Sequence, residues 1–167
     1  PTWMGRAAQV DGRRLRTAGR IWMANTLQDQ VVMIAGGKGV GQYIPIASNT
    51  EDEIILERPW AVEPDSTSLL AVRVNKSQVV ITQNRFADAS VAVQLYALSY
   101  GFIVDGNVSE RTGGMYAIGW DYMKQSERVY STAFFNQWLN NDLSEGFTCQ
   151  QGGFMHGILG LSGRPSV

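Results

Sequence analysis

Cysteine and histidine are almost absent from this sequence. Cys149 is the only cysteine and His156 is the only histidine. A single cysteine excludes an intrachain disulfide, and it also excludes a zinc site of the cysteine-rich kind. A catalytic triad would have to use His156, yet no Gly-x-Ser-x-Gly segment is present to supply a nucleophile. We expect no cofactor. His156 lies among glycines and apolar residues, and we interpret it as a packed or capping residue.

Long apolar runs and an excess of one charge are also missing. No run of 18 apolar residues occurs, so the sequence predicts no membrane span. The 14 lysines and arginines nearly balance the 15 aspartates and glutamates, so no basic field points to nucleic acid. The aspartates of the second half are scattered rather than spaced as in a calcium loop. No metal site is therefore expected.

One glycine-rich stretch, Gly36-Gly37-Lys38-Gly39-Val40-Gly41, has some features of a phosphate-binding loop. In such a loop the lysine is followed by serine or threonine and then by a helix. Here Gly39 follows Lys38, and the next segment, QYIPIA, has the alternation of a strand around Pro45. The stretch therefore predicts a hairpin turn between two strands, and nucleotide binding is not expected.

The rest of the chain divides into three parts by pattern. Residues 1–19 are polar and arginine-rich without periodicity, so we expect an irregular arm or linker there. Residues 20–75 contain short apolar segments separated by turn residues, which predicts a small antiparallel β-rich subdomain. These segments are RIWMAN, QVVMIAGG, GQYIPIAS, DEIILERPW and SLLAVRV. Residues 76–167 show no helical period and contain a spaced pattern of another kind.

That pattern is built on Asn84, Asn107 and Asn141, each of which follows a short apolar segment. The spacings are 23 and 34 residues, and the longer one corresponds to the shorter with an 11-residue insertion. A second segment, SVAVQLY, aligns with GGMYAIG and then with TCQQGGF. Such a period is typical of a parallel β-solenoid, in which coils stack about 4.8 Å apart. Asparagine tolerates a left-handed bend and its amide bonds to its neighbours, so we expect the three side chains to form a ladder.

The segment NRFADASVAVQLYALSYGFIVDGNVSERTGGMYAIG resembles the right-handed parallel β-helix proteins of the pectate-lyase-like superfamily. Coils of that family often read Asn-x-Phe, then Gln-Leu-Tyr, then Asn and Arg-Thr-Gly-Gly. The earlier segment GVGQYIPIASNTEDEIILERPWAVEPDSTS is similar to a β-rich insertion in such proteins. The resemblance implies an all-β fold, with right-handed parallel β-helix (solenoid) coils over residues 76–167 preceded by the small antiparallel subdomain over residues 20–75.

The resemblance also implies a function on carbohydrate. The superfamily includes polysaccharide lyases, glycoside hydrolases, phage tailspikes and surface proteins without known catalysis. We therefore expect a carbohydrate-active or carbohydrate-binding protein that acts on an extracellular polysaccharide, outside the cell or on a cell or virion surface. Whether it is an enzyme, and whether a lyase or a hydrolase, stays open. The alternative is a non-catalytic structural or adhesive module, such as a phage tail or extracellular fibre subunit.

Three coils are few for this superfamily. Both ends of a solenoid expose strands or apolar core unless something covers them. The expected partners are therefore a polysaccharide and further protein, either neighbouring chains or additional segments of a larger chain.

The spacings predict that three charged residues occupy equivalent positions in successive coils, and we call these residues the charged column. The shorter spacing places Asp88 beside Arg111, and the longer spacing places Glu145 on the other side of Arg111. This column fits a charge ladder that fixes the register of the coils. It also fits a catalytic site, either a lyase-like arginine base or a pair of hydrolytic carboxylates. Two steps of about 4.8 Å would separate the carboxylates by about 10 Å, which is long for hydrolysis and favours the ladder.

The 11-residue insertion carries the candidate substrate-binding residues. It falls in GWDYMKQSERVYST, and loops added to a rigid scaffold are where function tends to lie. Aromatic faces stack on sugars, while acidic groups and arginines hold hydroxyls. The same side chains dominate protein–protein contacts, so both interpretations stay open. The candidates are Trp120, Asp121, Tyr122, Glu127, Arg128 and Tyr130.

Overall fold

The computed structural model describes residues 1–167 except 18, 125–126, 132, 147–157 and 162–167, and for residues 120–131, 144–146 and 158–161 it describes the backbone alone. All regular elements of the described part are β-strands, so the predicted all-β class is confirmed. That part includes no helix long and apolar enough to cross a membrane. The chain separates into two compact units, unit 1 (Pro1–Asn75) and unit 2 (Lys76–Val167).

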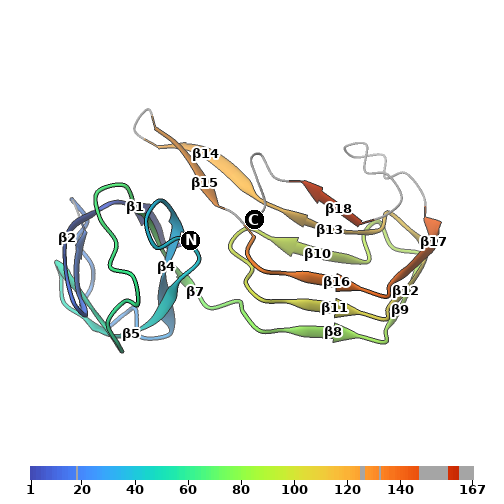
Figure 1. The fold of residues 1–167 in the computed structure, drawn as a ribbon, viewed down its shortest axis with the longest axis horizontal. Helices are drawn as coiled ribbons and strands as arrows, with labels where there is room; N and C mark the ends of the chain where they lie inside the picture. Colours follow the sequence, from blue (N-terminus) through green and yellow to red (C-terminus); the bar gives the residue numbers. More distant parts are fainter. Residues whose placement is uncertain (18, 125–126, 132, 147–157, 162–167) are drawn as a thin grey trace. The chain divides into compact units, whose positions relative to one another are not determined.

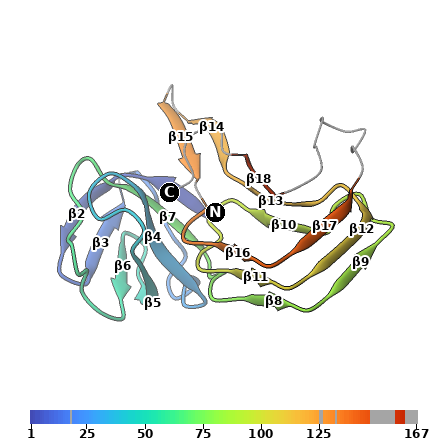
Figure 2. The same cartoon turned by 45° about the vertical axis from the view of Figure 1, so that its right-hand side comes forward.

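Unit 1 is an antiparallel sheet of seven strands that curls until it is nearly closed (Figures 1 and 2). The strand order is β1-β7-β4-β5-β6-β3-β2. Four of the five strands predicted for residues 20–75 are present as β4 to β7, and the antiparallel pairing is confirmed. The strands are β1 (Trp3–Gly5), β2 (Ala7–Asp11), β3 (Arg14–Thr17), β4 (Gln30–Gly36), β5 (Tyr43–Asn49), β6 (Glu53–Leu56) and β7 (Leu69–Val74).

The curled sheet encloses one apolar core. Alternate residues of a strand point to the same face, and in β6 the fully buried residues are Ile54 and Leu56. Trp3 and Trp22 meet edge to face in this core, with ring centroids 6.3 Å apart. The indole N–H of Trp22 donates to Thr17 Oγ1 at 3.1 Å, so the polar end of this buried ring is satisfied.

The prediction that residues 1–19 form an irregular arm is wrong. They supply β1, β2 and β3, half-buried strands of the same sheet. Asp11 pairs with Arg14 across a tight turn in which Gly12 has a φ of 57°. The two turn residues are Gly12 and Arg13, and glycine favours the first position of such a two-residue hairpin because that position needs a positive φ.

The prediction of a strand at RIWMAN is also wrong, and Asn49 explains why. This side chain is 2% exposed, and its Oδ1 accepts hydrogen bonds from the backbone N–H groups of Thr26 and Leu27 at 3.0 and 3.1 Å. Its Nδ2 donates to the carbonyl of Met23 at 2.8 Å. These bonds hold residues 23–27 as a loop, although Trp22 is buried as a strand residue would be.

The glycine-rich stretch is a hairpin turn, as predicted. Strands β4 and β5 pair antiparallel, with Val31 opposite Pro45. The turn is held from the side by one segment: Lys38 N–H donates to Thr67 Oγ1 at 3.3 Å, and Ser68 Oγ donates to Lys38 O at 2.7 Å. The stretch therefore works as a connector between strands.

Unit 2 contains three short parallel sheets, with strand orders β16-β11-β8, β17-β12-β9 and β10-β13-β18 (Figure 1). The chain passes through the three sheets in the same sequence three times. One apolar cluster takes Val104 from the first sheet, Phe86 from the second, and Val93 and Met115 from the third, so the sheets share a core. The strands are β8 (Val80–Thr82), β9 (Arg85–Ala87), β10 (Val93–Tyr96), β11 (Ile103–Asp105), β12 (Val108–Thr112), β13 (Met115–Ile118), β16 (Gln137–Leu139), β17 (Asp142–Gly146) and β18 (Ile158–Leu161).

Pairing in the first of these sheets follows the predicted spacings. Ile103 of β11 pairs with Val80 of β8 and with Gln137 of β16, in the steps of 23 and 34 residues that separate the asparagines. In the third sheet Val93 pairs with Met115, one residue short of the predicted step.

The prediction that TCQQGGF supplies the next strand of the third sheet is wrong, because β18 pairs with β13 there. The segment itself, with Cys149 and the nearby His156, lies outside the described residues.

Candidate functional site

Asn84, Asn107 and Asn141 form the predicted ladder across the bends between the first and second sheets of unit 2. Nδ2 of Asn84 donates to Oδ1 of Asn107, and Nδ2 of Asn107 donates to Oδ1 of Asn141, both at 2.9 Å. Each accepting oxygen also receives the backbone N–H of the preceding asparagine at 3.0 Å. Nδ2 of Asn107 and of Asn141 further donates to the carbonyls of Ile81 and Val104. The ladder thus fixes the level of each strand and positions the charged residues that follow it.

Two ion pairs link β12 to β9 and to Asp88, the residue that follows β9. Arg111 Nε and Nη2 donate to the two carboxylate oxygens of Asp88 at 2.6 and 2.7 Å, which confirms the predicted neighbours. Arg85 Nη2 donates to Glu110 Oε2 at 2.7 Å. The Asp88 and Arg111 side chains are 68% and 56% exposed, so water screens their attraction.

The third residue of the predicted column, Glu145, lies one position away from the expected register. The backbone of β17 places Glu145 opposite Glu110 of β12 rather than opposite Arg111, because the pairing shifts after Val108. Such a shift marks a β-bulge, which the fixed spacing of the asparagines does not reveal. The Glu145 side chain lies outside the described part of the structure.

The chemistry of the Asp88–Arg111 pair fits a structural contact. Hydrogen bonding from the Arg111 side chain lowers the pKa of Asp88 below its ordinary value. Asp88 is therefore ionised at neutral pH and has no proton to give to a leaving group. A two-pronged bond to a carboxylate also orients the guanidinium, so the pair suits register fixing better than acid catalysis.

We expect an NMR titration of the Asp88 carboxyl to show this effect directly. Its pKa should lie below the ordinary aspartate range in the wild type and return toward that range in Arg111→Gln. Because the folded-state pKa is lowered, the stabilisation from this pair is present above the unfolded pKa and is lost as pH falls through the folded value. Arg85→Gln removes the neighbouring pair and should leave Asp88 unchanged. If the pKa of Asp88 is the same in Arg111→Gln as in the wild type, Arg111 is not the cause of the lowered value.

The 11-residue insertion forms a β-hairpin rather than an irregular loop. Strand β14 (Trp120–Lys124) follows β13 after one residue and pairs antiparallel with β15 (Glu127–Ser131) (Figure 1). All six candidate substrate-binding residues lie on this hairpin, and Asp121 is opposite Tyr130. The backbone thus brings the six together, while their side chains lie outside the described residues and their binding role stays a prediction.

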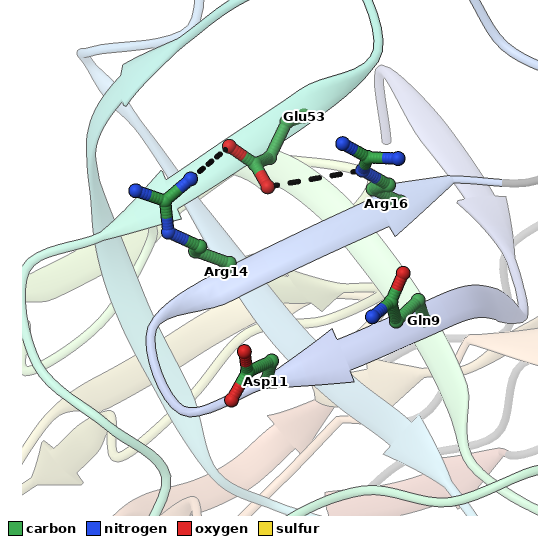
Figure 3. A pocket seen from close by; sticks show the side chains of 5 residues that line it. All are labelled: Gln9, Asp11, Arg14, Arg16 and Glu53. Carbon is green, nitrogen blue, oxygen red and sulfur yellow. Dashed lines mark hydrogen bonds and ion pairs between the residues drawn. The ribbon is translucent and has the colours of Figure 1, made fainter.

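A polar pocket on unit 1 is a further candidate site that the sequence did not predict. It has a volume of about 460 Å³ and is lined by Gln9, Asp11, Arg14, Arg16 and Glu53. The two arginines flank the Glu53 carboxylate, with Arg14 Nη1 at 3.0 Å from Oε2 and Arg16 Nε at 3.8 Å from Oε1 (Figure 3). Gln9 and Asp11 extend the polar surface along the neighbouring strand β2. We call these five residues the arginine pocket.

The alternation of polar and apolar residues in β3 is a sequence signal for the arginine pocket. Arg14 and Arg16 enclose Leu15, which is fully buried, so the arginines point outward from β3. Guanidinium groups recognise carboxylates and hydroxyls, and a carboxylate and an amide accept hydrogen bonds from hydroxyls. This chemistry suits a hydroxyl-rich ligand that carries an acid group.

The described residues contain no group of three or more histidine, cysteine, aspartate and glutamate side chains placed to hold a metal ion. No protein-family model, curated protein or solved structure matches this chain. Its function is therefore inferred from the stacked sheets, the hairpin and the arginine pocket.

Proposed function

We propose that unit 2 consists of three coils of a right-handed parallel β-helix and that the protein binds an extracellular polysaccharide. The observation that carries the proposal is the stack of parallel strands with its asparagine ladder. Strands separated by the same steps lie side by side, and the ladder bonds one level to the next. This is the arrangement expected of a solenoid, in which each coil contacts only its neighbours.

The bends between strands support the same proposal. Gln83, Gly106 and Asn140 are separated by the two asparagine steps and have left-handed φ values of 55°, 61° and 49°. A left-handed conformation is unfavourable for a glutamine, so its recurrence at equivalent positions indicates a bend that stacking imposes. Equal bends at equal positions are what allow successive coils to superpose.

The step from this architecture to polysaccharide rests on the resemblance and on the polar surfaces. Parallel β-helix proteins of the superfamily that the sequence resembles act on polysaccharides, which is an analogy at the level of the fold. The chain adds two features of suitable chemistry, the aromatic and charged residues in the sequence of the β14–β15 hairpin and the arginine pocket of unit 1. A polysaccharide with acid groups, such as a uronate polymer, matches the arginines.

Binding fits the charged residues of unit 2 better than cleavage does. Glycoside hydrolysis needs two carboxyl groups about 5–9 Å apart, one of them with a raised pKa. Within the described side chains of the β9–β12 surface, Asp88 and Glu110 are each bonded to an arginine, and the pKa of Asp88 is lowered. We therefore propose a binding protein and assign no catalytic role to Asp88, Arg111 or Glu145.

The test is calorimetric titration of the protein with polygalacturonate and, in parallel, with the neutral polymer dextran. We expect the double variant Arg14→Gln/Arg16→Gln to bind polygalacturonate at least about tenfold more weakly, because each charge-assisted hydrogen bond contributes about 1.5–3 kcal/mol. Arg13→Gln changes an exposed arginine that does not line the pocket and serves as the matched control. Trp120→Ala reports on the hairpin separately. Absence of binding to both polymers at millimolar sugar would overturn the proposal.

A second candidate, a structural or adhesive module, is favoured by a different observation. Val79 and Val80, at the start of unit 2, are 40% and 60% exposed, although valines next to and within a strand are usually covered. An exposed apolar edge is typical of a surface that another strand covers. Self-association without polysaccharide binding would select this candidate.

A further inference from the structure

We infer that unit 2 stacks head to tail on unit 2 of a second copy of this chain. In the part of the chain that the structure describes, β8, β9 and β10 are paired on one side only, and so are β16, β17 and β18. Unpaired edges present rows of N–H and C=O groups that recruit further strands. The inference depends on the stacked coils proposed above, but it does not depend on a polysaccharide ligand.

The two ends of the asparagine ladder are complementary. Inside the chain, the Oδ1 of Asn107 accepts both the N–H and the Nδ2 of Asn84, and the same two bonds link Asn107 to Asn141. At the first end, Asn84 Oδ1 accepts no hydrogen bond, and at the last end the backbone N–H of Asn141 donates none, as far as the described residues extend. One end therefore offers an acceptor and the other end offers donors.

The bends at the two ends have the same conformation. Gln83 at the first end and Asn140 at the last have φ values of 55° and 49°, and Gln78 and Phe135 have values of 56° and 51°. The first strands of one copy can therefore lie on the last strands of another as β11 lies on β8. At these two bends the contact needs no change of backbone conformation.

Apolar side chains are exposed at both ends as well. Val80 is 60% exposed at the first end, and Leu139 is 43% exposed at the last. In the register of β8, β11 and β16, the next copy places Gln137 beside Val80 and Thr82 beside Leu139, so stacking covers one flank of each apolar side chain. The hydrogen-bonding complementarity and this partial burial point to the same occupant, a second copy in parallel register.

In the proposed contact, β8 and β9 of one copy pair in parallel with β16 and β17 of the next, about 4.8 Å away. The Oδ1 of Asn84 accepts the N–H and Nδ2 of the partner's Asn141, which repeats the bonds seen inside the chain. The two surfaces differ, so the contact is heterologous and each added copy exposes a new end. Association should therefore continue beyond dimers.

The test uses two variants of the full chain that each block one end, Val80→Lys and Leu139→Lys, in sedimentation velocity experiments. The wild type should form species larger than dimers as concentration rises. Each variant alone should stay monomeric, because every contact needs one intact end of each kind. An equimolar mixture of the two should form dimers and nothing larger, a doubling of mass. Val62→Lys, at an exposed valine of unit 1, is the matched control and should associate as the wild type does.

Three results would overturn the inference: a wild type that is monomeric up to about millimolar concentration, a single variant that dimerises alone, or a mixture that stays monomeric. Dimers of Leu139→Lys alone would mean that two β8 edges pair with each other. Circular dichroism establishes that each variant keeps its strands. If a variant loses them, Val79→Lys and Phe135→Lys block the same ends at other exposed positions. Polysaccharide binding is measured separately, so either proposal can fail without the other.

Discussion

Asn107→Ala should lower the free energy of unfolding of unit 2 by about 3–4 kcal/mol. Asn107 is completely buried and lies in the middle of the ladder, where it bonds to asparagines on both sides and to the carbonyl of Ile81. Alanine removes all of these hydrogen bonds and leaves the partly buried groups that made them without a partner in the chain. Each such unsatisfied group costs about 1–3 kcal/mol, and partial access of water to the partners keeps the total below the simple sum.

Asn84→Ala is the matched control for this prediction. Asn84 has the same residue type and the same position in its bend, but it is exposed and has a ladder partner on one side only. Its backbone N–H still reaches Asn107 Oδ1 in the variant, so we expect a loss of less than about 1 kcal/mol.

The comparison requires guanidinium chloride unfolding followed by far-ultraviolet circular dichroism, with separate transitions fitted for the two units. Equal losses for Asn84→Ala and Asn107→Ala would contradict the role of burial and of two-sided bonding in the ladder.

The ladder also explains why so much of unit 2 is predictable from sequence. Asparagine is chemically distinctive, and it recurs because the bend needs a side chain that bonds above and below. Its spacing therefore predicts the strand pairing of β8, β11 and β16, and it also predicts that Asp88 lies next to Arg111. The same spacing fails at Glu145, where a bulge shifts the register by one residue. A local irregularity of this kind leaves the repeat intact and so leaves no trace in the spacing.

In unit 1 as well, the elements determined by their own residues are predictable from sequence, and those determined by distant residues are not. Strands β4 to β7 are predictable because their own residues alternate or are continuously apolar. The segment around Trp22 is not, because the residue that makes it a loop is Asn49, far away in the sequence. Strand β3 is short and mostly polar, and it is stabilised by its pairing with β6, where Leu15 lies opposite Ile54. Missing β3 means missing the arginine pocket, whose two arginines it carries.

Gly37→Ala should destabilise unit 1 by more than about 3 kcal/mol, the second large effect that we expect. Gly37 has a φ of 76°, which is left-handed and unfavourable for alanine. A Cβ at this position would overlap the carbonyl oxygen of Thr67 and would lie 2.9 Å from Cα of Ser68. Both are backbone atoms, so a side-chain rotation cannot relieve the overlap.

The segment that the new Cβ would strike is itself held in place. Asp65 Oδ1 accepts the backbone N–H of Thr67 at 2.8 Å and the hydroxyl of the same residue at 2.6 Å. Ser68 Oγ bonds back to the carbonyl of Lys38, next to the substituted position. Moving the segment away would break this contact between the turn and residues 65–68, so the strain adds to the loss of hydrogen bonds.

Gly12→Ala separates the two contributions. Gly12 also has a left-handed φ, 57°, but a Cβ there would meet no atom within 4 Å. Its cost should be the conformational term alone, about 1–2 kcal/mol. Calorimetric unfolding of both variants checks the difference. If the two glycines cost the same, the close approach of residues 67–68 does not constrain the turn. If Gly37→Ala costs more, as expected, Gly37 is required for the packing of the turn against residues 67–68. A turn packed in this way is a connector between strands, so ATP should not raise the melting temperature of the wild type.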